Sequence, residues 1–145
     1  EERQVVTFTL ADERYGVDIA VVKEIIVVPT LTKVEQVDPS ILGMTNLRGK
    51  LLPVMDLRRC FHMLPHELTS ASRVLVLEHN RREIGILVDG VNQVMNIAEQ
   101  DIESSDTDGG LLPSMLAGIG KTADGMVQLL QLDSIVGGQA RAVSV

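Results

Sequence analysis

Apolar and polar residues alternate along several short stretches, a pattern typical of β-strands that bury one face. Residues 6–10 and 15–19 alternate on either side of a polar turn, which predicts a β-hairpin. Residues 73–88 repeat this arrangement, and residues 117–132 predict a further hairpin around an Ala-Asp-Gly turn. The pattern therefore predicts a mainly β protein built from short hairpins.

Helical patterns are few and short. Asp18 is a predicted N-cap for a segment that places Ile19, Val22 and Ile25 on one face. Residues 57–61 predict one further helical turn. We therefore expect a few short helices among the strands.

The apolar pattern repeats after about 70 residues. A shift of 69 places residues 15–17 on residues 84–86, and a shift of 75 places residues 51–57 on residues 126–132. Units of this size bury little surface alone, so two of them should pack together around a shared aliphatic core. The sequence predicts two packed β-barrels of about five strands each.

The repeat also defines the expected domain organisation. We expect a single domain over residues 1–138, with repeat units at about 5–61 and 73–136. The sequence leaves open whether the two barrels exchange strands. Residues 139–145 show no periodic pattern, so we expect a frayed C-terminal tail.

The stretch from residue 41 to residue 61 contains a lone charge in an apolar context. An apolar turn ends at Gly43, and the polar loop Asn46-Leu47-Arg48-Gly49 leads into an apolar strand. A charged side chain in such a stretch is either paired or part of a binding surface. Arg48 is therefore the first candidate for a functional residue.

Two compatible interpretations of Arg48 remain open. In one, a partly buried guanidinium forms a structural ion pair with Glu24 and fixes the loop to the segment around Val22. In the other, the loop and that segment present a surface to a partner. The repeat supports a contact between the two residues, because Glu24 falls on Gln93 and Arg48 falls on Ala123, so both charges are lost together.

Composition narrows the possible partners. Three of 145 residues are aromatic, and the net charge is −7. Nucleic-acid binding needs a basic face and stacking platforms, so we expect no nucleic-acid partner. No apolar run approaches the roughly 18 residues of a membrane-spanning helix, so we expect no direct membrane insertion. The single cysteine, Cys60, fits a reducing cytoplasm.

The sequence offers little chemistry for catalysis. It lacks a glycine-rich phosphate loop and a nucleophile elbow, and Cys60 next to His62 is better interpreted as a small buried residue. His62 and His66 could share a metal on a helix, but Pro65 lies between them and a third ligand is not evident. The acidic stretch 101–110 lacks the spacing of a calcium loop. We expect no enzymatic activity, no cofactor and no metal.

Several short motifs occur in a specific order over almost the whole chain. They are V-x-F-x-L at 6–10, Y-G-V-D-I at 15–19, V-x-E-I-I at 22–26, N-L-R-G at 46–49, P-V-M-D-L-R at 53–58, G-I-L-V-D at 85–89, V-N-Q-V at 91–94 and L-L-Q-L-D at 129–133. In this order and spacing, the chain resembles CheW-type coupling (adaptor) proteins of bacterial chemosensory arrays.

The resemblance implies two five-stranded SH3-like barrels and a non-catalytic scaffold. Such a scaffold joins the cytoplasmic tips of chemoreceptors to the regulatory domain of the histidine kinase CheA, and it is a cytoplasmic protein recruited to membrane receptor arrays. By the same likeness, Val22, Glu24, Gly43 and the loop Asn46-Leu47-Arg48-Gly49 lie at or beside the groove that contacts the receptor.

Three alternatives remain open. The same fold could serve another chemosensory pathway, such as surface sensing or the control of type IV pili. The chain could also be the CheW-like part of a larger, CheV-type protein with a receiver domain. A small-molecule-binding barrel or an enzyme would require convergent polar groups in a cavity, and the sequence offers few of them.

Overall fold

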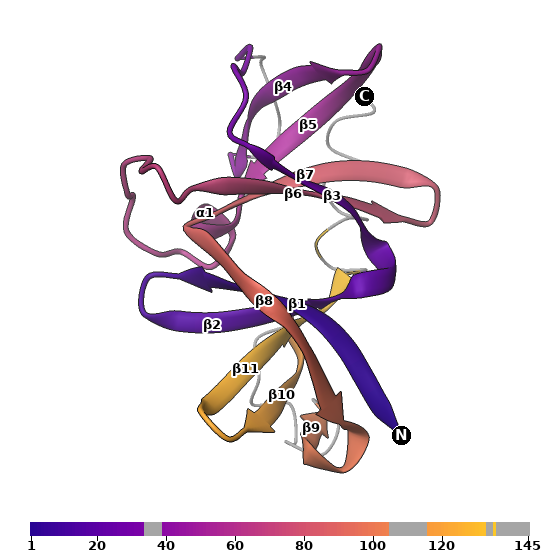
Figure 1. The fold of residues 1–145 in the computed structure, drawn as a ribbon. Coiled ribbons are helices and arrows are strands. Elements are labelled where there is room, and N and C mark those ends of the chain that lie inside the picture. Colours follow the sequence, from indigo (N-terminus) through magenta and orange to yellow (C-terminus); the bar gives the residue numbers. More distant parts are fainter. Residues whose placement is uncertain (34–38, 105–115, 133–134, 136–145) are drawn as a thin grey trace.

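The computed structural model describes residues 1–33, 39–104, 116–132 and 135, and strands dominate this part of the chain (Figure 1). In chain order the elements are β1 (Glu2–Leu10), β2 (Glu13–Asp18), the 3₁₀ turn η1 (Ile19–Val21), β3 (Val22–Val27), β4 (Ile41–Leu47), β5 (Lys50–Asp56), α1 (Leu57–Cys60), β6 (Arg73–His79), β7 (Arg82–Val88), β8 (Gly90–Ala98), the 3₁₀ turn η2 (Glu99–Asp101), β9 (Ile102–Ser104), β10 (Leu116–Thr122) and β11 (Gly125–Leu130). The helical turn predicted at residues 57–61 is confirmed as α1. The predicted tail at residues 139–145 lies outside the described residues.

The strands form two sheets, and each sheet takes strands from both halves of the chain. The order is β8-β1-β2-β11-β10-β9 in one sheet and β3-β6-β7-β5-β4 in the other. The parallel pairs β2 with β11 and β5 with β7 join strands of the first half to strands of the second. The predicted mainly β, two-barrel fold class is confirmed, although one sheet has six strands because the short β9 pairs with β10. We call the two sheets the five-stranded and the six-stranded barrel.

Apolar side chains form one core inside each barrel and a larger core between the barrels. The core of the six-stranded barrel contains Val5, Ile97, Val127 and Leu129, and that of the five-stranded barrel contains Leu52, Val54, Val74 and Val76. The central core takes side chains from both sheets: Val6, Phe8, Leu10, Tyr15, Val17, Ile41, Met55, Leu57, Leu75, Leu77, Ile84, Ile86, Val88, Leu116, Leu130 and Ile135.

Strand β6 shows how the sequence supplies two cores at once. Its residues 74–77 are all apolar and buried. Val74 and Val76 point into the five-stranded barrel, whereas Leu75 and Leu77 point into the central core. A strand buried on both faces reads as a continuous apolar run, because alternate side chains meet different apolar surroundings.

The few aromatic residues gather in the central core. The rings of Phe8 and Tyr15 stack with centroids 5.9 Å apart, and those of Tyr15 and Phe61 stack at 5.4 Å. The Tyr15 hydroxyl donates to Glu13 at 3.1 Å. Burial, assisted by this carboxylate, raises the pKa of Tyr15 to about 12, so the phenol stays neutral in the core.

The helical segment predicted after Asp18 is shorter than expected. Asp18 accepts a hydrogen bond from the Ala20 amide at 2.9 Å, as a cap should, but the helical turn ends at Val21. The next residues form β3, in which Ile25 lies opposite Leu75 of β6. Pairing of a β-branched segment with a buried strand outweighs the helical spacing, so this part of the prediction was wrong.

Gly43 and Gly118 occupy equivalent positions in β4 and β10, 75 residues apart. A Cβ on Gly43 would lie 2.6 Å from the carbonyl oxygen of Thr32, and a Cβ on Gly118 would lie 2.6 Å from that of Glu103. In both places a crossing backbone segment approaches the strand too closely for any side chain. This close contact means that the fold itself requires a glycine at position 43, independently of any role in binding.

We predict that Gly43→Ala lowers the free energy of unfolding by about 1–3 kcal/mol, because backbone must move to admit the methyl group. Gly118→Ala should cost a similar amount. Gly90→Ala is the matched control, since its nearest neighbour would be the Thr9 Oγ1 atom at 3.4 Å, an ordinary contact. Urea denaturation measures all three, and a Gly43→Ala variant as stable as the Gly90→Ala variant would refute the steric explanation.

Candidate partner-binding surface

The loop predicted as a candidate site is the tight turn between β4 and β5. Arg48 and Gly49 both have positive φ angles, of 54° and 83°. Two consecutive residues of this kind form a two-residue hairpin turn that matches the twist of the strands. The Asn46 side chain accepts a hydrogen bond from the Gly49 amide at 2.9 Å and stabilises the turn. Leu47 packs against the core of the five-stranded barrel.

Arg48 and Glu24 form a bidentate ion pair. Arg48 Nη2 donates to Glu24 Oε2 at 2.7 Å, and Nη1 donates to Oε1. The Arg48 side chain is 71% exposed and that of Glu24 is 26% exposed, so the expectation of a partly buried guanidinium was wrong. The turn carries Arg48 beyond the last strand pair, where the apolar neighbours in sequence no longer surround it. The hydrogen bond from Arg48 lowers the pKa of Glu24 below its ordinary value and keeps the pair charged.

The pair joins parts of the barrel that strand pairing leaves apart. β3 and β4 are the two edge strands of the five-stranded sheet. Backbone hydrogen bonds of 2.8 Å in both directions link Thr32 to Met44, and so connect the segment after β3 to β4. The ion pair adds a second link, from β3 itself to the tip of the β4–β5 hairpin. A fixed hairpin tip is a preorganised surface feature.

Exposed apolar side chains lie close in sequence to both members of the pair. Ile25 follows Glu24 and is 45% exposed, and Leu51 is 71% exposed. Val27, two residues further along β3, is 68% exposed. Single exposed apolar side chains are common on protein surfaces, whereas several of them on neighbouring elements, rimmed by polar residues, are typical of protein-binding surfaces. Ile25 and Val27 lie on the exposed face of β3, opposite to the half-buried face that carries Glu24.

The other predicted site residues lie away from the hairpin tip. Val22 is half-buried at the start of β3 and packs against the central core. Gly43 pairs with Val54 in the body of the sheet. The structure therefore brings together Glu24, Arg48 and the turn that carries Arg48, whereas Val22 and Gly43 contribute to the barrel beneath them.

The equivalent region of the six-stranded barrel is built differently. Gln93 and Ala123 replace the charged pair, and Arg14 instead donates to Thr122 Oγ1 in the β10–β11 turn at 3.0 Å. Ala123 lines a cavity of about 360 Å³ between that turn and β8. Arg14 also lies 3.7 Å from Asp124 in that turn, so both hairpin tips carry a charged link, but the bidentate pair with the tip arginine belongs to the five-stranded barrel.

A second ion pair, which was not predicted from the sequence, joins Arg58 of α1 to Asp89, which lies between β7 and β8. Arg58 Nη2 donates to Asp89 Oδ2 at 2.6 Å, and Nε donates to Oδ1 at 3.0 Å. Their side chains are 11% and 21% exposed. Both residues end motifs singled out in the sequence, P-V-M-D-L-R and G-I-L-V-D, and their opposite charges were the available signal.

The surroundings of Asp89 favour its charged form. Burial acts to raise the pKa of Asp89, but hydrogen bonds from Arg58 and from the Ala11 amide outweigh burial. The positive charge of Arg58 acts in the same direction, so the pKa of Asp89 lies below its ordinary value of 3.8.

Neither a metal-binding cluster nor a membrane-spanning helix is found among residues 1–33, 39–104, 116–132 and 135. Within them, no group of three or more His, Cys, Asp or Glu side chains is placed to hold a metal ion. No helix in the same ranges is both long and apolar enough to cross a bilayer.

Two SH3-like barrels that share a core and present a fixed polar hairpin tip define a protein-binding domain of the scaffold type. The family model described as CheW-like domain matches residues 4–139, so the chain belongs to this family. It is 33% identical over 137 residues to the chemotaxis protein CheW of Klebsiella aerogenes, covering 94% of this chain and 82% of that one. It is 32% identical to the chemotaxis protein CheW of Bacillus subtilis, over 70% of this chain and 65% of that one.

A solved structure gives the same result for the fold. The crystal structure of the scaffolding protein TtCheW from Thermoanaerobacter tengcongensis matches with a TM-score of 0.83 and 32% identity. The match covers 91% of this chain and 90% of that one. The resemblance stated from the motifs is thereby confirmed.

We predict that Asp89 makes the fold sensitive to acid. Because its pKa is lower in the folded state than in the unfolded chain, its contribution to stability is complete above pH 3.8 and is lost as the pH falls through the folded pKa. The free energy of unfolding should therefore fall more steeply in acid for the natural sequence than for Asp89→Asn. Urea denaturation across this pH range measures both slopes, and parallel curves would show that Asp89 is not responsible.

Proposed function

We propose that this chain is a non-catalytic adaptor of chemotaxis signalling that couples the cytoplasmic tips of chemoreceptors to the regulatory domain of the histidine kinase CheA. Its membership of the CheW-like family supports this function. Relatives named chemotaxis protein CheW and a structural neighbour named a scaffolding protein support it further. The adaptor would act in the cytoplasm and be held at the membrane by the receptors in an array.

The observation that carries the receptor-binding part is the exposed pair of Glu24 and Arg48 on the β4–β5 hairpin tip, whose equivalents in the other barrel are the uncharged Gln93 and Ala123. An exposed pair of this kind adds little to stability, because water screens both charges. Its rigid geometry is better explained by a partner that meets the β4–β5 tip and β3. Val22, Gly43, Asn46, Leu47 and Gly49 would support this surface from below.

The mechanism would be binding alone. The helical hairpin at a receptor tip presents apolar residues at helical spacing, and exposed Ile25, Val27 and Leu51 supply apolar contacts for such a helix. Contacts of this size are weak individually, and an array of many copies raises the effective affinity. Kinase binding would use other surfaces, and Val94 and Met126 of the six-stranded barrel are apolar side chains 49% and 61% exposed.

We predict that Arg48→Ala weakens binding to receptor-containing membranes by about fivefold or more, as loss of a central interface residue does. The protein should remain folded, because the pair is exposed. Co-sedimentation with chemoreceptor-containing membranes, with and without CheA, measures the change.

The matched control is Arg3→Ala. Arg3 also makes a bidentate pair with a glutamate, Glu99, at 3.1 and 3.2 Å, but it belongs to the six-stranded barrel. The control variant should co-sediment like the natural protein. If Arg48→Ala bound the membranes as well as Arg3→Ala does, the hairpin tip would not be the receptor-binding surface.

A further inference from the structure

The two barrels are joined at two places among the described strands. The chain passes from β2 to β3 through η1, and it passes from β7 to β8 through Asp89. The two crossings lie on opposite sides of the molecule, with α1 beside the second (Figure 1). The angle between the barrels therefore depends on the central core that packs between them and on what holds each crossing.

Asp89 holds the second crossing to both barrels. Its amide donates to the Thr9 carbonyl at 3.0 Å, and its Oδ2 atom accepts from the Ala11 amide at 2.7 Å, so the residue is fixed to the β1–β2 end of the six-stranded barrel. Its two carboxylate oxygens accept from Arg58 of α1, the helical turn that directly follows β5 of the five-stranded barrel. Arg58 Nη1 also donates to the Leu64 carbonyl at 2.9 Å and attaches the loop after α1.

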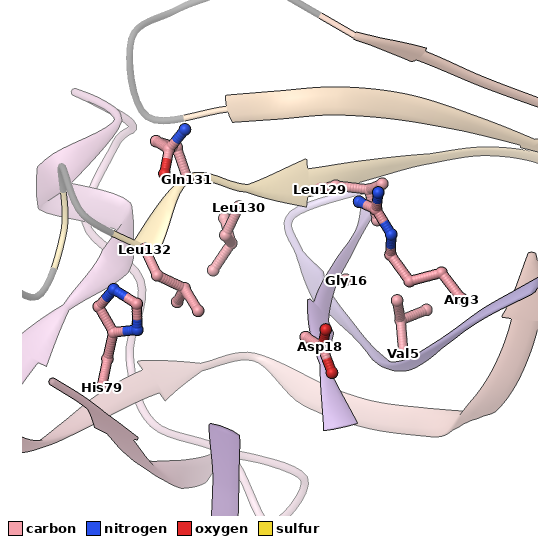
Figure 2. Close-up of a pocket in the computed structure, with 9 residues that line it drawn as sticks. All are labelled: Arg3, Val5, Gly16, Asp18, His79, Leu129, Leu130, Gln131 and Leu132. Carbon is pink, nitrogen blue, oxygen red and sulfur yellow. The ribbon is translucent and has the colours of Figure 1, made fainter. Parts of the chain in front are cut away.

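At the first crossing, the position equivalent to Asp89 carries no carboxylate. The residue equivalent to Asp89, at a shift of 69, is Ala20. Beside this crossing lies a cavity of about 200 Å³ between the barrels, which Figure 2 shows with His79 on one side and Asp18 and Leu132 facing it. The cavity is lined by Arg3, Val5, Gly16, Asp18, His79, Leu129, Leu130, Gln131 and Leu132. Charge-assisted hydrogen bonds thus fix the second crossing, and a cavity lies beside the first.

We propose that Arg58 and Asp89 form an inter-barrel ion pair that fixes the angle between the two barrels, and through it the relative placement of the partner-binding surfaces on each. Arg58 and Asp89 are positioning residues, since they lie away from the hairpin tip. The second part of this inference, that the angle places the partner-binding surfaces, rests on the proposed function. An adaptor that binds two partners at once needs a defined angle, whereas binding of either partner alone does not.

The direct test measures the distance between the barrels. Spin labels are placed at Val27→Cys in the five-stranded barrel and Met126→Cys in the six-stranded barrel, both exposed positions, with Cys60→Ala. Pulsed electron spin resonance then compares Asp89→Asn with the control Glu99→Gln, a carboxylate that pairs with Arg3 inside one barrel. We expect the distance distribution to shift or broaden for Asp89→Asn and to stay unchanged for Glu99→Gln.

Arg58→Lys provides a second variant if Asp89→Asn does not fold, because it retains the charge but loses the forked geometry. Arg58→Lys should also broaden the distribution of distances between the two spin labels. Urea denaturation of each labelled protein shows that both barrels remain folded. An unchanged distribution in the folded variants would overturn the proposal.

The second part of the inference is tested on unlabelled protein. Binding of a receptor-tip fragment alone and of the kinase regulatory domain alone should not change in Asp89→Asn, whereas simultaneous binding should weaken by about fivefold or more. If the distance between the labels changed in Asp89→Asn but the variant still bound both partners at once as well as the natural protein, the pair would have no role in coupling them. Failure of the natural protein to bind either partner would instead contradict the proposed function, and the distance measurement would still decide whether the pair fixes the angle.

Discussion

The exchange of strands between the two halves of the chain is the constraint on which the rest of the structure depends. β2 pairs with β11 and β5 pairs with β7, so each barrel is completed by strands from the other half. Central strands then carry alternate side chains into a barrel core and into the core between the barrels. Neither repeat unit can bury its apolar face alone, and the barrels are held together by the same burial that forms them.

This shared core leaves the surfaces free to differ between the barrels. The repeat retains what the fold needs, as at Gly43 and Gly118, where a crossing backbone excludes a side chain in both units. It diverges at the charged residues. Glu24 and Arg48 are replaced by Gln93 and Ala123, and Asp89 by Ala20, so each charged pair occurs once. Asymmetric charge on a nearly symmetric frame suits a scaffold that meets different partners on different sides.

The alternating pattern and the repeat were enough to predict the fold class, because burial of alternate residues determines both. The pattern could not show that Glu24 lies on a strand, since pairing with β6 overrode the helical spacing of Ile19, Val22 and Ile25. It also could not show that Arg48 is exposed, because a two-residue turn removes it from its apolar neighbours. Arg58 and Asp89 escaped notice because they are 31 positions apart and meet only where the barrels join.

We propose that the β4–β5 tip and β3 of the five-stranded barrel meet the receptor. The most direct measurement is a titration of the ¹⁵N-labelled chain with a receptor-tip fragment, followed by backbone amide chemical shifts. We expect the chemical shifts of Glu24, Ile25, Arg48 and Gly49 to change and those of the equivalent Gln93 and Ala123 to stay constant. Changes centred on the β10–β11 turn, or no changes at saturating fragment, would contradict it.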